Sequence, residues 1–65
     1  MDMRKMIKTF LVQQDSNTAE LSRRLGYSRS NLYDKYRRNT FSVEDLERIA
    51  EAYGHKLKVE FIPKD

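Results

Sequence analysis

Apolar residues recur at helical spacing in four stretches of the chain, and polar residues separate each stretch from the next. The first stretch has apolar residues at Met3, Met6, Ile7, Phe10 and Leu11. This i, i+3, i+4, i+7, i+8 spacing places one apolar stripe along a helix. The inward positions of the other stretches are Leu21 and Leu25, then Leu32 and Tyr36, then Leu46, Ile49, Ala50 and Tyr53. The spacing predicts helices over about residues 2–14, 18–25, 29–38 and 43–53.

Residues that favour helix ends stand at the borders of these stretches. The expected N-caps are Asp2, Asn17, Ser28 and Ser42. Such side chains accept hydrogen bonds from the free N–H groups of a first helical turn. Glu20 lies three residues after Asn17, which is the spacing of a capping-box-like pair, and Asp45 stands at the third position of the fourth helix. Gly26 and Gly54 are expected to end the second and fourth helices, because glycine readily adopts the left-handed conformation.

After Gly54 the pattern changes from helical to alternating. Leu57, Val59 and Phe61 would face one side of an extended segment, and Lys56, Lys58 and Glu60 the other. We therefore expect a half-buried strand over about residues 55–62, stopped by Pro63. The expected fold class is mainly α, with a single domain over residues 1–65 that has four helices and a C-terminal β-strand.

The length and composition of the chain exclude several classes of function. A chain of 65 residues has room for one small core and little room for an enclosed catalytic pocket. It has no cysteine and one histidine, so neither a thiolate nor a multi-histidine metal site is expected. The longest apolar run, Phe10-Leu11-Val12, is far too short to span a membrane. We expect no enzymatic activity, no cofactor, no metal, no small-molecule ligand, no membrane association and a cytoplasmic location.

The net charge of +3 is unevenly distributed. Residues 16–41 hold six basic and two acidic residues, whereas residues 42–54 hold one basic and four acidic. A basic block of this kind is typical of a surface that docks on a polyanion. An ordinary mixed surface whose charges cluster by chance is the alternative on charge alone.

Two short helices joined by a three-residue turn that begins with glycine form a helix-turn-helix pattern. The segment NTAELSRRLGYSRSNL, residues 17–32, resembles the core motif of the Xre family of phage Cro- and repressor-type regulators. Residues 43–54, VEDLERIAEAYG, are similar to the fourth helix of that family. The resemblance covers about residues 3–54. It implies a lambda-repressor-like fold and sequence-specific binding of double-stranded DNA, usually as a dimer.

The chain departs from the family pattern in two places. Lys35 stands where many members have an apolar residue, so Tyr36 must supply that contact with the core. Most members add a fifth helix, whereas this chain is expected to end in a strand. Dimerisation through a C-terminal strand, as in Cro-like members, is therefore the closer comparison.

Placing Leu32 and Tyr36 inward leaves the opposite face of the third helix free to enter a major groove. The candidates for contacts with bases are Arg29, Ser30, Asn31, Tyr33 and Asp34. Arg29 is the first candidate among them, because an arginine at the start of this helix can donate two hydrogen bonds to one guanine. Asp34 could accept from a cytosine amine, or it could pair with an arginine three or four residues further along the helix.

Candidates for phosphate contacts lie at the start of the second helix and around the end of the third. They are Asn17, Thr18, Arg37, Arg38, Asn39 and Thr40. A helix start offers free N–H groups to an anion. Arg23 and Arg24 are open to two interpretations. They could contact phosphates, or one of them could simply be solvated on the exposed face of the second helix.

The expected strand has no partner strand within the chain, so a second copy is expected to pair with it. Antiparallel pairing about Val59 would set Leu57 opposite Phe61, and Lys58 opposite Glu60, of the other copy. The expected partners are thus double-stranded DNA and a second copy of the chain. The alternative is a protein-interaction module, such as an antitoxin or anti-repressor of the same fold that binds a partner through the strand. Binding of RNA or single strands is disfavoured, because Tyr33 is the one tyrosine expected to face a nucleic acid.

Overall fold

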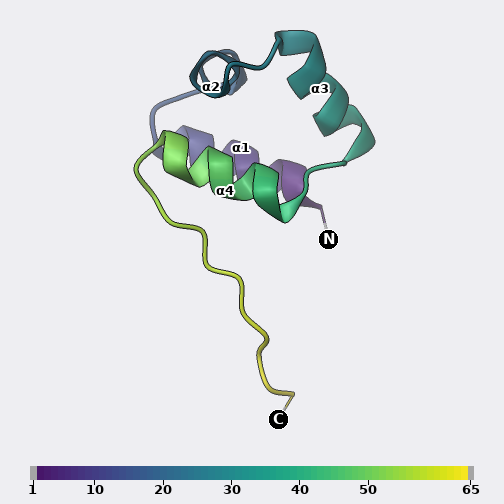
Figure 1. Cartoon of the computed structure of the whole chain (residues 1–65), viewed down its shortest axis with the longest axis vertical. Coiled ribbons are helices and arrows are strands. Elements are labelled where there is room, and N and C mark those ends of the chain that lie inside the picture. The colour runs from purple at the N-terminus through teal and green to yellow at the C-terminus, as the bar shows by residue number, and fades with distance from the viewer. Residues whose placement is uncertain (1, 65) are drawn as a thin grey trace.

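The four predicted helices are present in the computed structural model, which describes residues 2–64 (Figure 1). They are α1 (Met3–Gln13), α2 (Thr18–Leu25), α3 (Arg29–Arg38) and α4 (Val43–Ala52). Within residues 2–64, every helix is too short or too polar to cross a membrane.

Each helix begins at its predicted N-cap. The side chains of Asp2, Asn17 and Ser28 accept hydrogen bonds from backbone N–H groups in the first turns of α1, α2 and α3. Ser42 and Asp45 form a capping box, in which each side chain accepts from the backbone N–H of the other. The capping-box-like pair predicted at the start of α2 is half formed, because Asn17 accepts from the Glu20 N–H but the Glu20 carboxylate bonds to Arg23 and Arg24. The predicted helices are one residue too long at some ends, because capping residues themselves lie outside the helix.

The core is built from the predicted inward positions of all four helices. Leu21 and Leu32 are completely buried, and Ile7 and Leu11 are 2% exposed. Tyr36 is buried as well, at 6% exposed. The contact that Lys35 cannot supply is thus made by its neighbour, as predicted. The other buried apolar side chains are Phe41, Leu46, Ile49 and Ala50.

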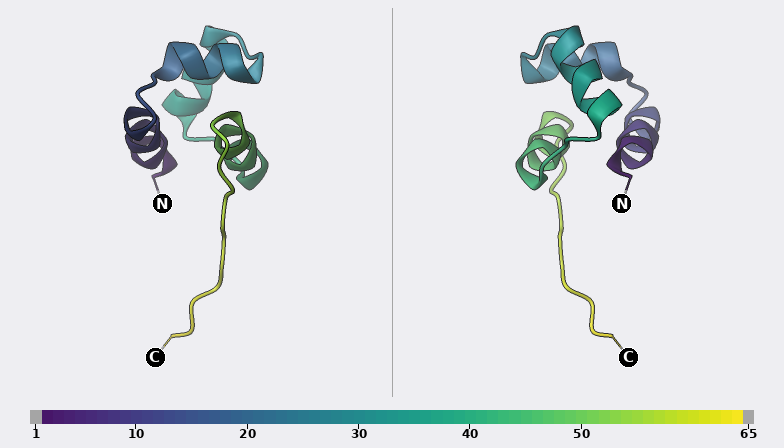
Figure 2. Two further views of the ribbon diagram at one scale, coloured as in Figure 1. Left: turned by 90° about the vertical axis from the view of Figure 1, so that its left-hand side faces the viewer. Right: turned by 90° about the vertical axis from the view of Figure 1, so that its right-hand side faces the viewer.

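The helices enclose this core from different sides. α1 and α4 lie side by side, and α2 and α3 lie across one end of this pair (Figures 1 and 2). α2 contacts α1, α3 and α4. The second helix therefore fixes the position of α3 relative to the rest of the domain.

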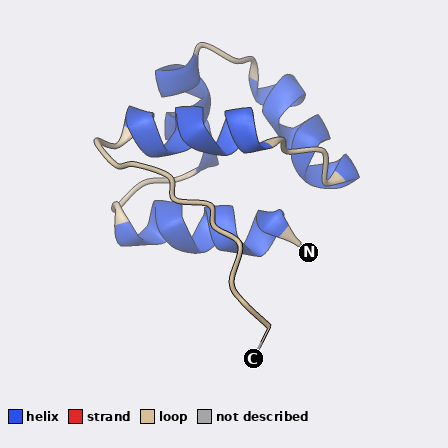
Figure 3. Ribbon diagram, turned by 60° about the horizontal axis from the view of Figure 1, so that its bottom comes forward, coloured by secondary structure: helices blue, strands red, loops and turns tan. Residues whose placement is uncertain are grey.

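The expected strand over residues 55–62 is not formed. Within residues 2–64 no strand occurs, and residues 55–64 run as an extended tail away from α2 and α3 (Figures 1 and 3). A strand needs a second strand to receive its N–H and C=O groups, and the chain has none to offer. The alternating pattern thus gives an extended backbone but no sheet. Leu57 is the exception in the tail, because it packs against the core.

Candidate nucleic-acid interface

The turn between α2 and α3 fixes the angle at which α3 leaves the domain. Gly26 has φ 73° and ψ 18°, the left-handed conformation that side chains with a Cβ resist. Tyr27 N–H donates to the carbonyl of Ser22 at 3.0 Å, which closes the end of α2. Ser22 is 3% exposed and donates its hydroxyl to the Ala19 carbonyl at 2.7 Å, so it lies in the helix contact without an unpaired polar atom.

α3 has one buried stripe and one free face. Leu32 and Tyr36 point into the core, whereas Tyr33 on the other side is 53% exposed. A shallow hollow on the free face is lined by Ser30, Asn31, Tyr33, Asp34 and Arg37. Arg29 is exposed at the start of the helix. The structure therefore brings the predicted base-contacting residues together on the outer surface of one helix.

Charges on this face are partly paired. Asp34 forms ion pairs with Arg37 and with Arg38, the latter at 3.2 Å between Nε and Oδ1. The hydrogen bond from Arg37 is the main cause that lowers the pKa of Asp34, so the carboxylate is charged at neutral pH. Arg29, in contrast, makes no ion pair with any residue from 2 to 64. Asp34 thus makes the ion pairs along its helix that were one of its two expected roles.

The predicted phosphate contacts lie at two separate ends. Asn17 and Thr18 stand at the start of α2, where the Asn17 side-chain oxygen already accepts from Glu20 N–H at 2.9 Å. Asn39 ends α3 in a left-handed conformation with φ 53°, and Thr40 beside it is exposed. The two sites are the first turn of α2 and the last turn of α3 with its loop.

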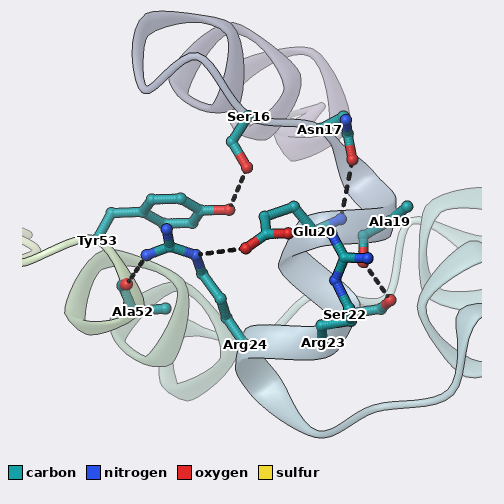
Figure 4. A network of polar contacts seen from close by, with 9 residues as sticks. All are labelled: Ser16, Asn17, Ala19, Glu20, Ser22, Arg23, Arg24, Ala52 and Tyr53. Atoms are coloured by element: carbon teal, nitrogen blue, oxygen red, sulfur yellow. Dashed lines mark hydrogen bonds and ion pairs between the residues drawn. The ribbon is translucent and has the colours of Figure 1, made fainter.

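A network around Arg24 was not foreseen from the sequence (Figure 4). The Arg24 guanidinium lies over the Tyr53 ring at 4.4 Å and donates to the Ala52 carbonyl at 2.8 Å. It also bonds to Glu20 on its own helix at 3.3 Å. The Tyr53 hydroxyl is 2.6 Å from the hydroxyl of Ser16, before α2. Arg24 therefore joins α2 to the end of α4 and is not simply solvated, whereas Arg23 pairs only with Glu20 among the residues from 2 to 64.

Two further contacts, with α4 and with α1, hold α3 against the rest of the domain. The Lys35 ammonium lies 3.2 Å from the Asp45 carboxylate on α4, and both side chains are partly buried. The Arg4 guanidinium on α1 donates to the Tyr36 carbonyl at 3.4 Å. A charged residue among apolar positions was the only sequence signal for the first contact. The sequence held no signal for the second, because 32 residues separate its partners.

The predicted dimer residues lie in the tail and face solvent, apart from Leu57. Val59 is 67% exposed and Phe61 is fully exposed. Lys58 and Glu60 pair with each other at 3.3 Å along the tail. Among residues 2–64, no group of three or more histidine, aspartate or glutamate side chains is placed to hold a metal ion.

Comparison with known proteins gives one match. Residues 6–58 match the family described as the Cro/C1-type HTH DNA-binding domain. No match was found among curated proteins or among solved structures. The matched segment includes the whole of α2, the turn, α3 and α4. The chain therefore belongs to the family of Cro/C1-type helix-turn-helix DNA-binding domains.

Proposed function

We propose that the chain is a transcriptional regulator that recognises a specific double-stranded DNA sequence with α3 in the major groove. The observation that carries this proposal is the free face of α3. It presents side chains that can hydrogen-bond, and the buried stripe of the same helix ties that face to the core. In a helix-turn-helix domain, residues near the start of the second helix reach the edges of bases.

Arg29 is the proposed principal base reader. It is exposed and unpaired among residues 2–64, so its five donors are available to a guanine. Ser30, Asn31 and Tyr33 are proposed to contact neighbouring bases. Asp34 is proposed to pair with Arg37 and Arg38 until phosphates compete for them, or to accept from a cytosine amine where the operator provides one.

Phosphate contacts are proposed at the two ends described above. At the start of α2 the free N–H groups and the Thr18 side chain face the backbone of one strand. After α3, Arg38 with Asn39 and Thr40 is proposed to contact the backbone on the other side of the groove. These contacts orient α3 but carry no sequence information of their own.

Selection of bound duplexes from a random-sequence library tests the proposal. The selected DNA is expected to share one motif, and Arg29→Ala is expected to weaken binding to it by about 1–3 kcal/mol. Binding of the same variant to random duplexes should change little. Recovery of no motif would refute sequence-specific recognition, and an equal loss on both DNAs would make Arg29 a phosphate contact.

We also propose that two copies pair through the tail and bind a palindromic operator. Val59, Phe61 and Ile62 are 67%, 105% and 79% exposed, which leaves three large apolar side chains uncovered on an extended backbone. Antiparallel pairing centred on Val59 would supply the missing hydrogen bonds and bring Leu57 against Phe61 of the other copy. Half-sites would then lie about 34 Å apart, one turn of the duplex.

Sedimentation velocity of Val59→Asp, compared with the unmodified chain, tests this pairing. Val59 contacts no core residue, so the variant is expected to stay folded and become monomeric, because two carboxylates would meet at the centre of the paired strands. Truncation after Gly54 is the second variant, and we expect it to be monomeric and less stable because it also removes Leu57 from the core. A Val59→Asp chain that remains dimeric would exclude the proposed register.

A further inference from the structure

A second groove extends the free face of α3 onto α1. It has a volume of about 830 Å³, and its α3 side includes Tyr33 and Arg37, which also line the hollow on the front of α3. Its α1 side includes Lys5, Lys8 and Val12. The two hollows therefore adjoin at Tyr33 and Arg37, and a duplex seated on α3 would have α1 along one border.

Lys5 and Lys8 are held on this border by the fold. Ile7 and Leu11 point into the core, and positions 5, 8 and 12 lie together on one flank of the same helix at 100° per residue. The Lys8 ammonium lies 5.3 Å from the centre of the Tyr36 ring, on the inner side of α3. The side chain therefore reaches across from α1 toward the recognition helix.

The absence of ion pairs separates these lysines from Arg4, Arg37 and Arg38. Arg4 is bound by Asp2 at 2.9 Å, and Arg37 and Arg38 are bound by Asp34. Lys5 and Lys8 make no ion pair with any described residue. They can therefore neutralise phosphates without first breaking an ion pair inside the protein, although Lys8 would leave the face of the Tyr36 ring.

We propose that Lys5 and Lys8 bind the phosphate backbone of the same duplex that α3 enters, so that α1 is a third DNA-contacting element. The two residues are three positions apart, which is a rise of about 4.5 Å along the helix. Phosphates of one strand follow each other at about 3.4 Å along the duplex axis, so two flexible lysines can reach neighbouring phosphates. This inference rests on the proposed DNA-binding function.

The salt dependence of DNA binding tests the inference without knowledge of the operator. A mixed-sequence duplex of about 20 base pairs, long enough for two turns of DNA, is titrated with the unmodified chain and with Lys5→Gln/Lys8→Gln at several salt concentrations. Loss of two phosphate contacts should reduce the slope of log affinity against log salt by about 1.8 per bound chain. The penalty of the variant should then shrink by about twelvefold between roughly 50 and 200 mM salt.

Lys56→Gln/Lys64→Gln is the matched control. Both residues lie in the tail but outside Leu57–Phe61, the residues proposed to pair, and neither forms an ion pair with residues 2–64. The tail leaves the helices at the end opposite α2 and α3 (Figure 2). The control removes the same formal charge, so it should leave the slope nearly unchanged. Equal slopes for the two double variants would overturn the inference, because the effect would then be one of net charge.

A positional measurement complements the slope. The chain has no cysteine, so Lys8→Cys carries a single thiol to which an iron chelate that cleaves DNA can be attached. Cleavage is expected at one short stretch of backbone beside each bound α3, and Lys56→Cys should give none there. Binding without localised cleavage would overturn the inference and leave the proposed function intact. Absence of any salt-dependent binding by the unmodified chain would instead refute the proposed function.

Discussion

The ion pair between Lys35 and Asp45 offers a measurable link between the recognition helix and the rest of the domain. The two side chains are 26% and 12% exposed and lie 3.2 Å apart, and Asp45 also accepts the Ser42 N–H at 2.9 Å. Asp45→Ala therefore removes one of the two hydrogen bonds of the capping box and leaves a partly buried ammonium unpaired. Loss of that hydrogen bond costs about 1 kcal/mol.

The coupling between the two charges is expected at the upper end of the range for surface pairs and below that of a buried pair. Exposed pairs contribute about 0–1 kcal/mol, whereas removal of one partner of a buried pair costs about 3–5 kcal/mol. We expect about 1 kcal/mol of coupling, and about 2 kcal/mol in total for Asp45→Ala. For a domain of this size, that total lowers the melting temperature by about 12 °C.

Urea unfolding, followed by helical circular dichroism, measures both quantities. The set is the unmodified chain, Lys35→Met, Asp45→Asn and the double variant. The Asp45→Asn change keeps a side-chain oxygen for the Ser42 N–H but removes the charge, so the cycle isolates the interaction with Lys35. A coupling energy indistinguishable from zero would refute the role of this pair in holding α3 against α4.

The same pair predicts a pH dependence with a definite sign. Burial of Asp45 disfavours its charged form, but the Ser42 N–H and the Lys35 ammonium outweigh burial and lower its pKa. A carboxyl with a lowered pKa in the folded state stabilises the fold above its ordinary pKa, and the contribution disappears as pH falls through the folded-state value. The difference in stability between the unmodified chain and Asp45→Asn should therefore shrink below about pH 4. A difference that stays constant down to about pH 2 would contradict the assignment.

Three further substitutions check other parts of the structure. Arg24→Ala should cost about 1 kcal/mol in urea unfolding, because it removes the contacts with the Tyr53 ring and the Ala52 carbonyl, and Arg24→Lys should restore only part of the loss. Gly26→Ala should cost about 1–2 kcal/mol from backbone strain alone, since a Cβ there would meet no atom within 4 Å. Asn tolerates the left-handed region better than Ala, so Gly26→Asn should be the milder change, and equal losses would point to a steric cause. Arg38→Ala should weaken binding to duplexes of every sequence and lower the salt slope by roughly 0.9, and an unchanged slope would exclude Arg38 from the interface.

The helices and most of the core were accessible from the sequence because they depend on local spacing. Apolar residues at i, i+3 and i+4 and a capping residue before each run are sufficient to place α1 to α4 within a residue or two. The free face of α3 followed from the same spacing once Leu32 and Tyr36 were directed inward. These features require no knowledge of which helix packs against which.

The contacts between distant segments were not accessible in the same way. Nothing near Arg24 in the sequence indicates that its guanidinium lies on Tyr53, and nothing near Lys8 indicates that it lies beside Tyr36. The strand over residues 55–62 was predicted wrongly for the single chain, because alternation describes which side a residue faces and not whether a partner strand exists. Sequence patterns of period two cannot distinguish an unpaired extended tail from a paired strand.

The ion pairs of Asp34 bear on how the domain would search along DNA. Arg37 and Arg38 carry their counter-ion within their own helix, so random duplexes must displace a carboxylate before they gain either arginine. A phosphate that displaces the carboxylate gains less binding free energy than a phosphate that meets an unpaired cation, so non-specific binding is weaker. A duplex that offers Asp34 an amine in the major groove would replace part of what the carboxylate loses when both arginines move to phosphates. One acidic residue at the centre of a basic helix would then favour rapid departure from wrong sites and long residence at the right one.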